Sequence, residues 1–268
     1  MKKKLSILVA LALICSLCLT ACGGSGEEEP AEEAKDQPAG AEIHVFAAAS
    51  MTDCLDEIIE LYQKDSANTV VPVYESSGTL EKQILEGADC DIFISANQEK
   101  MDSVQEQGAV DEDTRKDLLG NNLTLISSAE KESVVKDVES LLSDDVKTIA
   151  IGEPADVPAG QYAEELFKNM GIWDQIQPKL VYAKNVRAVL EYVDGGDADA
   201  GLVYHTDALL MENGKIICDA PEDKYTAVNY PAAIMSEAPQ PEAAADFYEF
   251  LQTDEVKTIF EKYGFIVL

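Results

Sequence analysis

The chain has 268 residues, of which 46% are hydrophobic, and its formal net charge is −31. A charge of this sign and size argues against nucleic acid or anionic lipid as a partner, because both are negatively charged themselves. It also means that any anion site must attract its ligand locally, against the field of the whole protein.

The N-terminus has the features of an export signal. Lys2 to Lys4 precede an apolar run over 5–19, which is too short for an ordinary transmembrane helix. The run ends in Leu19-Thr20-Ala21-Cys22, which resembles the bacterial lipobox. This resemblance implies that 1–21 is a lipoprotein signal peptide and that the mature protein is exported and anchored to the membrane by a lipid on Cys22. Loss of the three leader lysines would take the net charge from −31 to −34.

Residues 22–41 are predicted to be a disordered acidic tether. After Cys22 this segment is rich in Gly, Ser, Pro, Ala and Glu, and it has no aromatic or branched apolar residue with which to bury surface. Cys54, Cys90 and Cys218 are the three cysteines beyond it. An odd, scattered set permits one disulfide at most and lacks metal-ligand spacing, so we expect small, mostly buried thiols without a function.

From residue 42 onward, short apolar runs alternate with amphipathic stretches. Strands are predicted over 43–48, 70–74, 92–95, 123–127, 148–151, 180–182, 200–204 and 230–235. Helices are predicted over 52–64, 79–86, 100–107, 161–169, 186–193, 206–211, 242–252 and 254–263. This alternation is typical of the α/β class with mainly parallel sheets flanked by helices. We expect two lobes, 42–121 with 230–268 and 122–229, joined by two chain crossings that act as a hinge.

Small polar residues stand at several predicted junctions between a strand and the next helix. Ser50, Ser77, Ala159 and Asn185 lie at such positions. Ligands of open α/β sheets bind at these ends of the strands, where free amides and the positive dipole ends of helices favour anions. Each residue alone is better explained as an ordinary helix cap or by packing. Together they predict an anion site between the lobes.

As an ordered set, the motifs at these junctions closely resemble the periplasmic molybdate-binding proteins of ABC-type uptake systems. The motifs are Phe46-Ala47-Ala48-Ala49-Ser50, Ser76-Ser77-Gly78-Thr79-Leu80, Asp91-Ile92-Phe93-Ile94-Ser95-Ala96, Val157-Pro158-Ala159-Gly160-Gln161-Tyr162-Ala163, Gly201-Leu202-Val203-Tyr204 and Phe260-Glu261-Lys262-Tyr263-Gly264-Phe265. The resemblance covers 43–268. It implies a two-lobed type II periplasmic-binding-protein fold that closes on its ligand.

The same resemblance implies the ligand, its contacts and the partner. The ligand is molybdate or tungstate, bound by the hydroxyls and amides of Ser50 and Ser77, the amides of Ala159 and Val186, and the hydroxyl of Tyr204, with no direct metal-ion ligand and no cofactor. The partner is an ABC transporter permease, and the protein is expected to be a monomer and not an enzyme. Gly78 replaces a serine of many relatives; since it is not an implied contact, little effect is expected.

Arg187 directly follows the implied contact Val186, and we expect it to form a supporting ion pair rather than to touch the ligand. A site made only of neutral donors predicts rejection of phosphate, whose proton needs an acceptor. Sulfate would be disfavoured by its smaller size.

Other functions stay open from the residues alone. They are binding of another small oxyanion such as sulfate, an enzyme acting on a small anion, or an adhesive or structural lipoprotein. His205 with Asp207 could form a base and its orienting group, but a histidine at the rim of the cleft without a catalytic role is favoured. Asp194, Asp197 and Asp199 lack the spacing of an EF-hand calcium loop.

Overall fold

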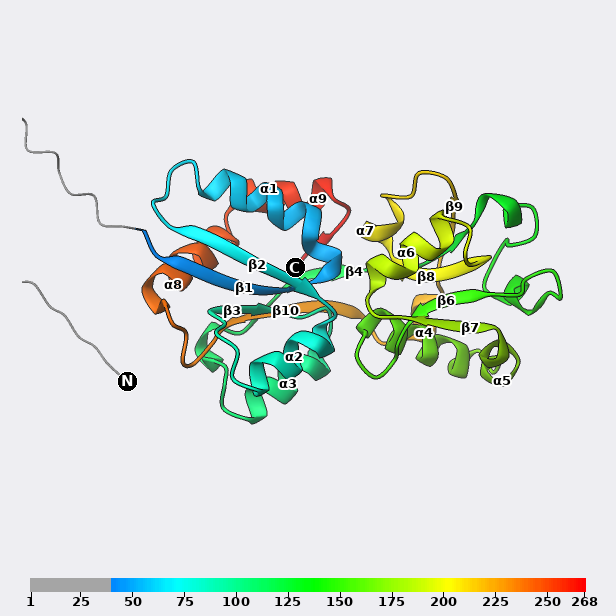
Figure 1. Ribbon diagram of the computed structural model, residues 1–268, viewed down its shortest axis with the longest axis horizontal. Coiled ribbons are helices and arrows are strands. Elements are labelled where there is room, and N and C mark those ends of the chain that lie inside the picture. The colour runs from blue at the N-terminus through cyan, green and yellow to red at the C-terminus, as the bar shows by residue number, and fades with distance from the viewer. Residues whose placement is uncertain (1–39) are drawn as a thin grey trace, which may run out of the picture. The chain divides into compact units, whose positions relative to one another are not determined.

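The computed structural model describes residues 40–268, which contain two β-sheets flanked by helices (Figure 1). The predicted signal peptide, Cys22 and nearly all of the predicted tether lie outside the described residues. Within 40–268, no helix is both long enough and apolar enough to cross a membrane. The α/β class predicted from the sequence is confirmed.

The first sheet has six strands in the order β11-β4-β10-β3-β1-β2. Their bounds are β1 Glu42–Ala48, β2 Thr69–Glu75, β3 Ile92–Ile94, β4 Lys116–Asn121, β10 Val228–Ile234 and β11 Ile266–Val267. The helices associated with it are α1 Thr52–Tyr62, α2 Ser77–Leu85, α3 Gln98–Glu106, α8 Pro241–Phe250 and α9 Asp254–Lys262. Figure 1 shows α1 and α9 on one side of this sheet and α2 and α3 on the other. We call this sheet with its helices lobe I.

The second sheet has five strands in the order β7-β6-β8-β5-β9. Their bounds are β5 Leu123–Ser127, β6 Ile149–Gly152, β7 Leu180–Ala183, β8 Ala200–Tyr204 and β9 Lys215–Asp219. Its helices are α4 Pro158–Asn169, α5 Trp173–Ile176, α6 Val186–Asp194 and α7 His205–Ala208. Figure 1 shows α6 and α7 on one side and α4 and α5 on the other. We call this sheet with its helices lobe II.

Both sheets are mixed, and the antiparallel strands include those that carry the chain between the lobes. In lobe I, β1 is parallel to β2 and β3, whereas β10 is antiparallel to β3 and β4. In lobe II, β6 is parallel to β7 and β8, whereas β5 is antiparallel to β8 and β9. The chain leaves the first sheet at Asn121, enters the second at Leu123 and returns at Val228, two residues before the expected position 230.

The inner strands of the parallel regions are buried on both sides, as is typical of sheets covered by helices on two faces. Every residue of β3, β6 and β8 is buried. The strands β1 and β8 end facing the other lobe, and each is followed directly by helical residues. The fold therefore brings the carboxyl ends of strands and the first turns of helices from both lobes to one place.

Candidate functional site

A small cavity of about 10 Å³ lies between the two lobes. Its lining is formed by Ala48, Ala49, Ser50, Glu75, Ser76, Ser77, Ala96, Val157, Pro158, Ala159, Asn185, Val186 and Tyr204. Pockets for drug-sized ligands usually have about 300–1,000 Å³. This cavity is far smaller than that, which excludes a drug-sized ligand.

The structure brings all five predicted contact residues to this one cavity. Ser50 follows β1 in the short 3₁₀ helix Ala49–Met51, and Ser77 is the first residue of α2. Ala159 is the second residue of α4, and Val186 is the first residue of α6. Tyr204 is the last residue of β8. Lobe I supplies the two serines, and lobe II supplies the other three residues.

The N–H groups of Ser77, Ala159 and Val186, in the first turns of these helices, donate no hydrogen bond within the described residues. The first backbone N–H groups of a helix have no intrahelical acceptor. Ser76 caps α2 by accepting from Thr79 N at 3.1 Å, and Asn185 caps α6 by accepting from Ala188 N at 2.9 Å. Pro158 begins α4 without an N–H of its own, so Ala159 presents the first amide of that helix. Converging helix N-termini with unused amides favour negative charge.

The two serine hydroxyls are held so that each can donate a hydrogen bond to a ligand. Ser77 Oγ accepts from Ala96 N at 2.9 Å, which leaves its own hydrogen free. Ser50 Oγ lies 2.8 Å from the hydroxyl of Tyr230, which itself accepts from Asn121 Nδ2 at 3.3 Å. Either hydroxyl can donate in this pair, and when Tyr230 donates, the Ser50 hydrogen is available to the cavity.

The hydroxyl of Tyr204 is buried, lines the cavity and has no hydrogen-bond partner among the described residues. The residue is 1% exposed, and burial raises the pKa of its hydroxyl, which therefore remains protonated. Leaving a buried polar group unpaired costs about 1–3 kcal/mol. A lone buried donor in a cavity with free amides indicates a place for an acceptor that comes from outside the chain.

Arg187 connects the two lobes beside the cavity. It follows Val186 in α6, and its Nη2 donates to Asp53 Oδ2 at 2.5 Å and to the carbonyl of Ser50 at 3.4 Å in lobe I. Its Nε lies 2.6 Å from Oδ1 of the fully buried Asp207 in lobe II, without good hydrogen-bond geometry between the two atoms. Burial raises the pKa of Asp207 to about 7, although the Arg187 charge acts in the opposite direction. Arg187 is absent from the cavity lining, in keeping with the supporting ion pair predicted for it.

A match to a family model places this geometry in a known group of proteins. The model of the bacterial extracellular solute-binding proteins matches residues 43–266. The chain belongs to this family.

Individual relatives in the solute-binding family cover most of the chain. YvgL of Bacillus subtilis, named as an ABC transporter substrate-binding lipoprotein, is 37% identical over 99% of both chains. The molybdate-binding protein ModA of Escherichia coli is 38% identical over 84% of this chain and 89% of its own. A solved substrate-binding domain assigned to a molybdenum ABC transporter of Clostridium difficile is 38% identical, covers 85% of this chain and 100% of its own, and has a TM-score of 0.67.

Two residues of this solute-binding protein were not predicted for the site. Tyr230 orients Ser50 across 180 positions of sequence, and no local pattern announces such a contact. Glu75 is half-buried in the cavity wall at the end of β2, and its Oε2 lies 3.5 Å from Asn185 Nδ2 of the other lobe. In the sequence, its position directly before Ser76-Ser77 could have indicated that Glu75 lies at the site. The sequence suggested a lining made only of hydrogen-bond donors. The carboxylate of Glu75 adds an acceptor to it.

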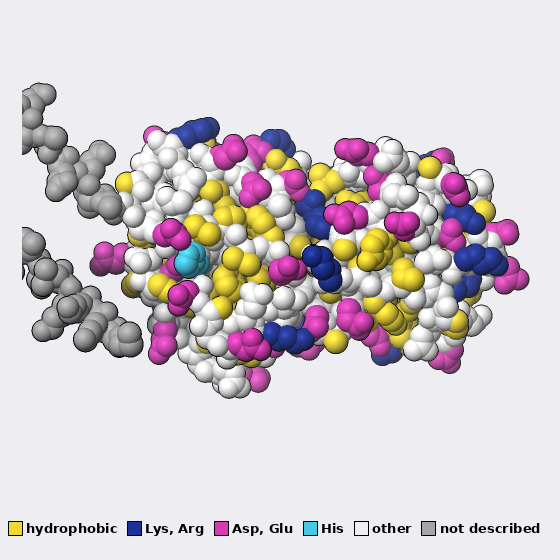
Figure 2. Space-filling view, in the orientation of Figure 1, with side chains coloured by type: hydrophobic (Ala, Val, Ile, Leu, Met, Phe, Trp, Pro, Cys, Tyr) yellow, Lys and Arg dark blue, Asp and Glu magenta, His cyan; other side chains and the backbone are white. Residues whose placement is uncertain are grey.

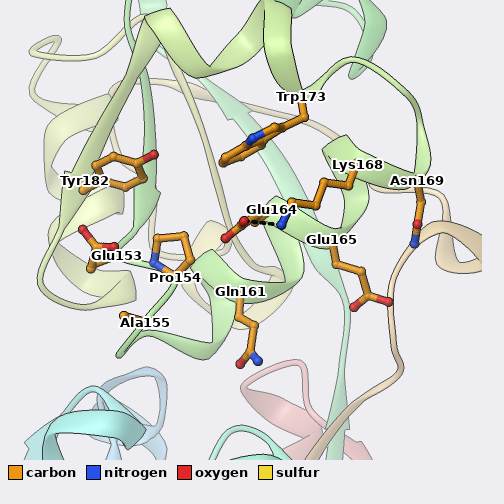
Figure 3. Close-up of a pocket in the computed structure, with 10 residues that line it drawn as sticks. All are labelled: Glu153, Pro154, Ala155, Gln161, Glu164, Glu165, Lys168, Asn169, Trp173 and Tyr182. Atoms are coloured by element: carbon orange, nitrogen blue, oxygen red, sulfur yellow. Dashed lines mark ion pairs between the residues drawn. The ribbon is translucent and has the colours of Figure 1, made fainter.

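A larger groove of about 720 Å³ on lobe II is lined by Trp173, Tyr182 and three glutamates, Glu153, Glu164 and Glu165 (Figure 3). Glu164 pairs with Lys168 near the centre of this groove. Its surplus of carboxylates makes it a poor place for an anion. Figure 2 shows Asp and Glu side chains over much of the visible face, with Lys and Arg atoms where the lobes meet.

The other polar residues considered in the sequence serve structural contacts. His205 Nδ1 lies 3.2 Å from Asp219 Oδ1. His205 therefore does not form the pair considered from the sequence, in which Asp207 would orient a histidine base. Asp194 accepts from the amides of Asn213 and Gly214 and so holds a loop. Within residues 40–268, no cluster of His, Cys, Asp or Glu could hold a metal ion.

The three cysteines of 40–268 are free thiols. Cys54 and Cys90 are buried, and burial raises the pKa of both thiols.

Proposed function

We propose that this solute-binding protein captures a tetrahedral oxyanion, molybdate or tungstate, outside the cytoplasm and delivers it to the permease of an ABC transporter. The observation that carries the proposal is the unpartnered, buried Tyr204 hydroxyl in a cavity formed by helix N-termini. The printed names of the E. coli and C. difficile relatives supply the choice of anion. The role is binding and delivery without turnover.

The proposed contacts are the hydroxyls and amides of Ser50 and Ser77, the amides of Ala159 and Val186, and the Tyr204 hydroxyl. All of them are neutral donors, which suits a fully deprotonated dianion. Hydrogen bonds to a charged group contribute about 1.5–3 kcal/mol each. Several such bonds in a cavity closed to water can hold a dianion although the formal net charge of the protein is −31.

Glu75 changes the expected basis of selectivity. The sequence predicted rejection of phosphate because no acceptor was available for its proton, but the Glu75 carboxylate lies in the lining. Rejection of hydrogen phosphate therefore does not follow from the donor set. Size still favours the larger ions over sulfate, because a donor beyond about 3.2 Å no longer makes a good bond.

The contacts come from both lobes, so we propose that the ligand stabilises the closed arrangement. The two chain crossings, between Asn121 and Leu123 and before Val228, would serve as the hinge. A ligand shifts such an equilibrium only by the difference in its affinity for the two states. Contacts that need both lobes provide that difference.

We also propose that Cys22 is lipidated and anchors the mature protein to the membrane. Support comes from the lipobox-like Leu19-Thr20-Ala21-Cys22 and from the lipoprotein name of the B. subtilis relative. In detergent phase partitioning, the wild-type protein should enter the detergent phase and Cys22→Ala should remain in the aqueous phase. Equal partitioning of both would contradict the anchor.

The test of the ligand is a thermal-shift and calorimetric panel of molybdate, tungstate, sulfate, phosphate and chromate. A ligand that binds only the native state raises its stability with the logarithm of ligand concentration. We expect the largest shifts with molybdate and tungstate. If none of the five anions shifts the melting temperature at millimolar concentration, the proposed function is wrong.

The variant Tyr204→Phe separates binding from folding. Removing one donor to a charged ligand should weaken molybdate binding about ten- to hundred-fold. The ligand-free protein should be equally stable or more stable, since the variant removes a buried hydroxyl without a partner. Unchanged affinity in Tyr204→Phe would show that the cavity is not the molybdate site.

A further inference from the structure

Arg187 of lobe II reaches across the boundary between the lobes and contacts the segment of lobe I that carries Ser50. Its Nη2 donates to Asp53 Oδ2 at 2.5 Å and to the carbonyl oxygen of Ser50 at 3.4 Å. Asp53 is the second residue of α1 and stands three positions after Ser50. Arg187 directly follows Val186 in the first turn of α6. One side chain therefore joins two segments that carry proposed ligand contacts, one from each lobe.

Within lobe II, a buried carboxylate holds Arg187 in place. Asp207 is 0% exposed, stands three positions after Tyr204, and has its Oδ1 2.6 Å from Arg187 Nε. In the described part of the chain, Arg187 is the one cation paired with this carboxylate. Removing the partner of a buried charge is strongly destabilising, so we expect this pair to persist whether the lobes are open or closed. The contact of Arg187 with Asp53, in contrast, depends on closure.

Helix α1 carries two acidic residues one turn apart whose ion pairs differ in one respect. Asp53 is 43% exposed, and Arg187 of the other lobe is its one ion-pair partner among residues 40–268. Glu57 is 36% exposed and pairs with Lys262 Nζ at 2.6 Å, and it accepts from the Tyr263 hydroxyl at 2.7 Å, both within lobe I. Opening of the lobes would therefore break the pair of Asp53 and leave the pair of Glu57 intact.

We propose that Asp53 is a positioning residue whose ion pair with Arg187 forms when the lobes close and slows the release of the bound oxyanion. The inference rests on the proposed function and assigns a role to two residues that are absent from the cavity lining. Because neither side chain lines the cavity, the pair acts on the reopening of the lobes and not on the entry of the ion. Its loss should therefore appear in the dissociation rate, as most differences in affinity between related complexes do.

The test compares Asp53→Ala with Glu57→Ala, a control that removes an ion pair of similar exposure from the same helix without touching the other lobe. In stopped-flow fluorescence with molybdate at pH 8, Asp53→Ala should raise the dissociation rate constant about three- to ten-fold and change the association rate constant by less than about two-fold. Glu57→Ala should leave both constants within about two-fold of wild type. Asp53→Glu keeps the carboxylate and should restore most of the slow release. The melting temperatures of the two alanine variants without ligand should be similar.

The variant Arg187→Lys tests whether the effect of Asp53 passes through the guanidinium. Lysine keeps a positive charge for Asp207 but lacks the planar fork with which arginine contacts two carboxylates at once. In this background, Asp53→Ala should change the dissociation rate constant by less than about two-fold. A wild-type dissociation rate in Asp53→Ala, or an equal rise in Glu57→Ala, overturns this inference and leaves the proposed function standing. If the wild-type protein responds to no anion of the panel, the proposed function fails and the inference falls with it.

Discussion

Asp207 is a fully buried carboxyl group beside Arg187, and burial raises its pKa to about 7. In the unfolded chain this group has its ordinary pKa near 3.8. Between these values the folded state binds a proton that the unfolded state has released. The contribution of Asp207 to stability is therefore fully present below pH 3.8 and is lost as the pH rises through about 7.

The variant Asp207→Asn should remove this pH dependence. We expect the difference in unfolding free energy, wild type minus variant, to fall between pH 5 and pH 7 with a slope of at most about 1.4 kcal/mol per pH unit. Urea unfolding at several pH values measures it, and the subtraction cancels the carboxylates common to both proteins. A difference that stays constant over this range would mean that Asp207 is already ionised at pH 5.

All five residues that the family resemblance implied as ligand contacts line the cavity, and each stands in or beside a short motif at the end of a strand. Ser50 and Ser77 follow apolar runs directly, and Tyr204 closes one. Tyr230 was not recognised, since its role depends on a distant partner, Ser50.

The elements most easily predicted were those with a clear apolar pattern. The strands 123–127 and 200–204 have the predicted bounds, and α4 begins three residues before the predicted 161 because Pro158 can occupy the first helical position. The missed strands β4 and β9 have exposed polar residues at their starts, and β11 has only two residues. Such strands are defined by pairing with neighbours rather than by their own apolar residues.

The first turn of α6 offers a test of how a helix cap positions the cavity. Asn185→Ala removes the bond to Ala188 N and should cost about 0.5–2 kcal/mol of stability. It should also weaken molybdate binding, because the Val186 amide is no longer held. Asn185→Asp keeps a capping oxygen and should retain most of the stability, but its added negative charge should weaken binding of an anion.

Thr253→Ala is the matched control for this prediction. Thr253 caps α9 by accepting from Val256 N at 3.4 Å, and it is not part of the cavity lining. The variant should lose stability and keep its affinity for molybdate. Chemical unfolding and calorimetry on the three variants separate the effects, and parallel losses of affinity in Thr253→Ala and Asn185→Ala would contradict a local role of the α6 cap.

For the whole molecule, the net charge repels an anion and the groups at the cavity attract it. This difference predicts how salt affects binding. The formal net charge of −31 repels a dianion at long range, whereas the helix N-termini and Arg187 act only near the cavity. The Debye length is about 30 Å at 0.01 M salt and about 10 Å at 0.1 M. At low salt the approaching ion therefore experiences the field of the whole protein, and at higher salt mainly the field of the site.

The association rate constant for molybdate should therefore rise as sodium chloride increases from 0.01 M to 0.1 M. Electrostatically steered association shows the opposite trend, with rates that fall as salt increases. The dissociation rate should change less, because the bound ion lies in a closed cavity where salt screens weakly. Stopped-flow fluorescence at several salt concentrations measures both constants. An association rate that falls with salt would mean that basic groups at the cavity mouth outweigh the net charge even at long range.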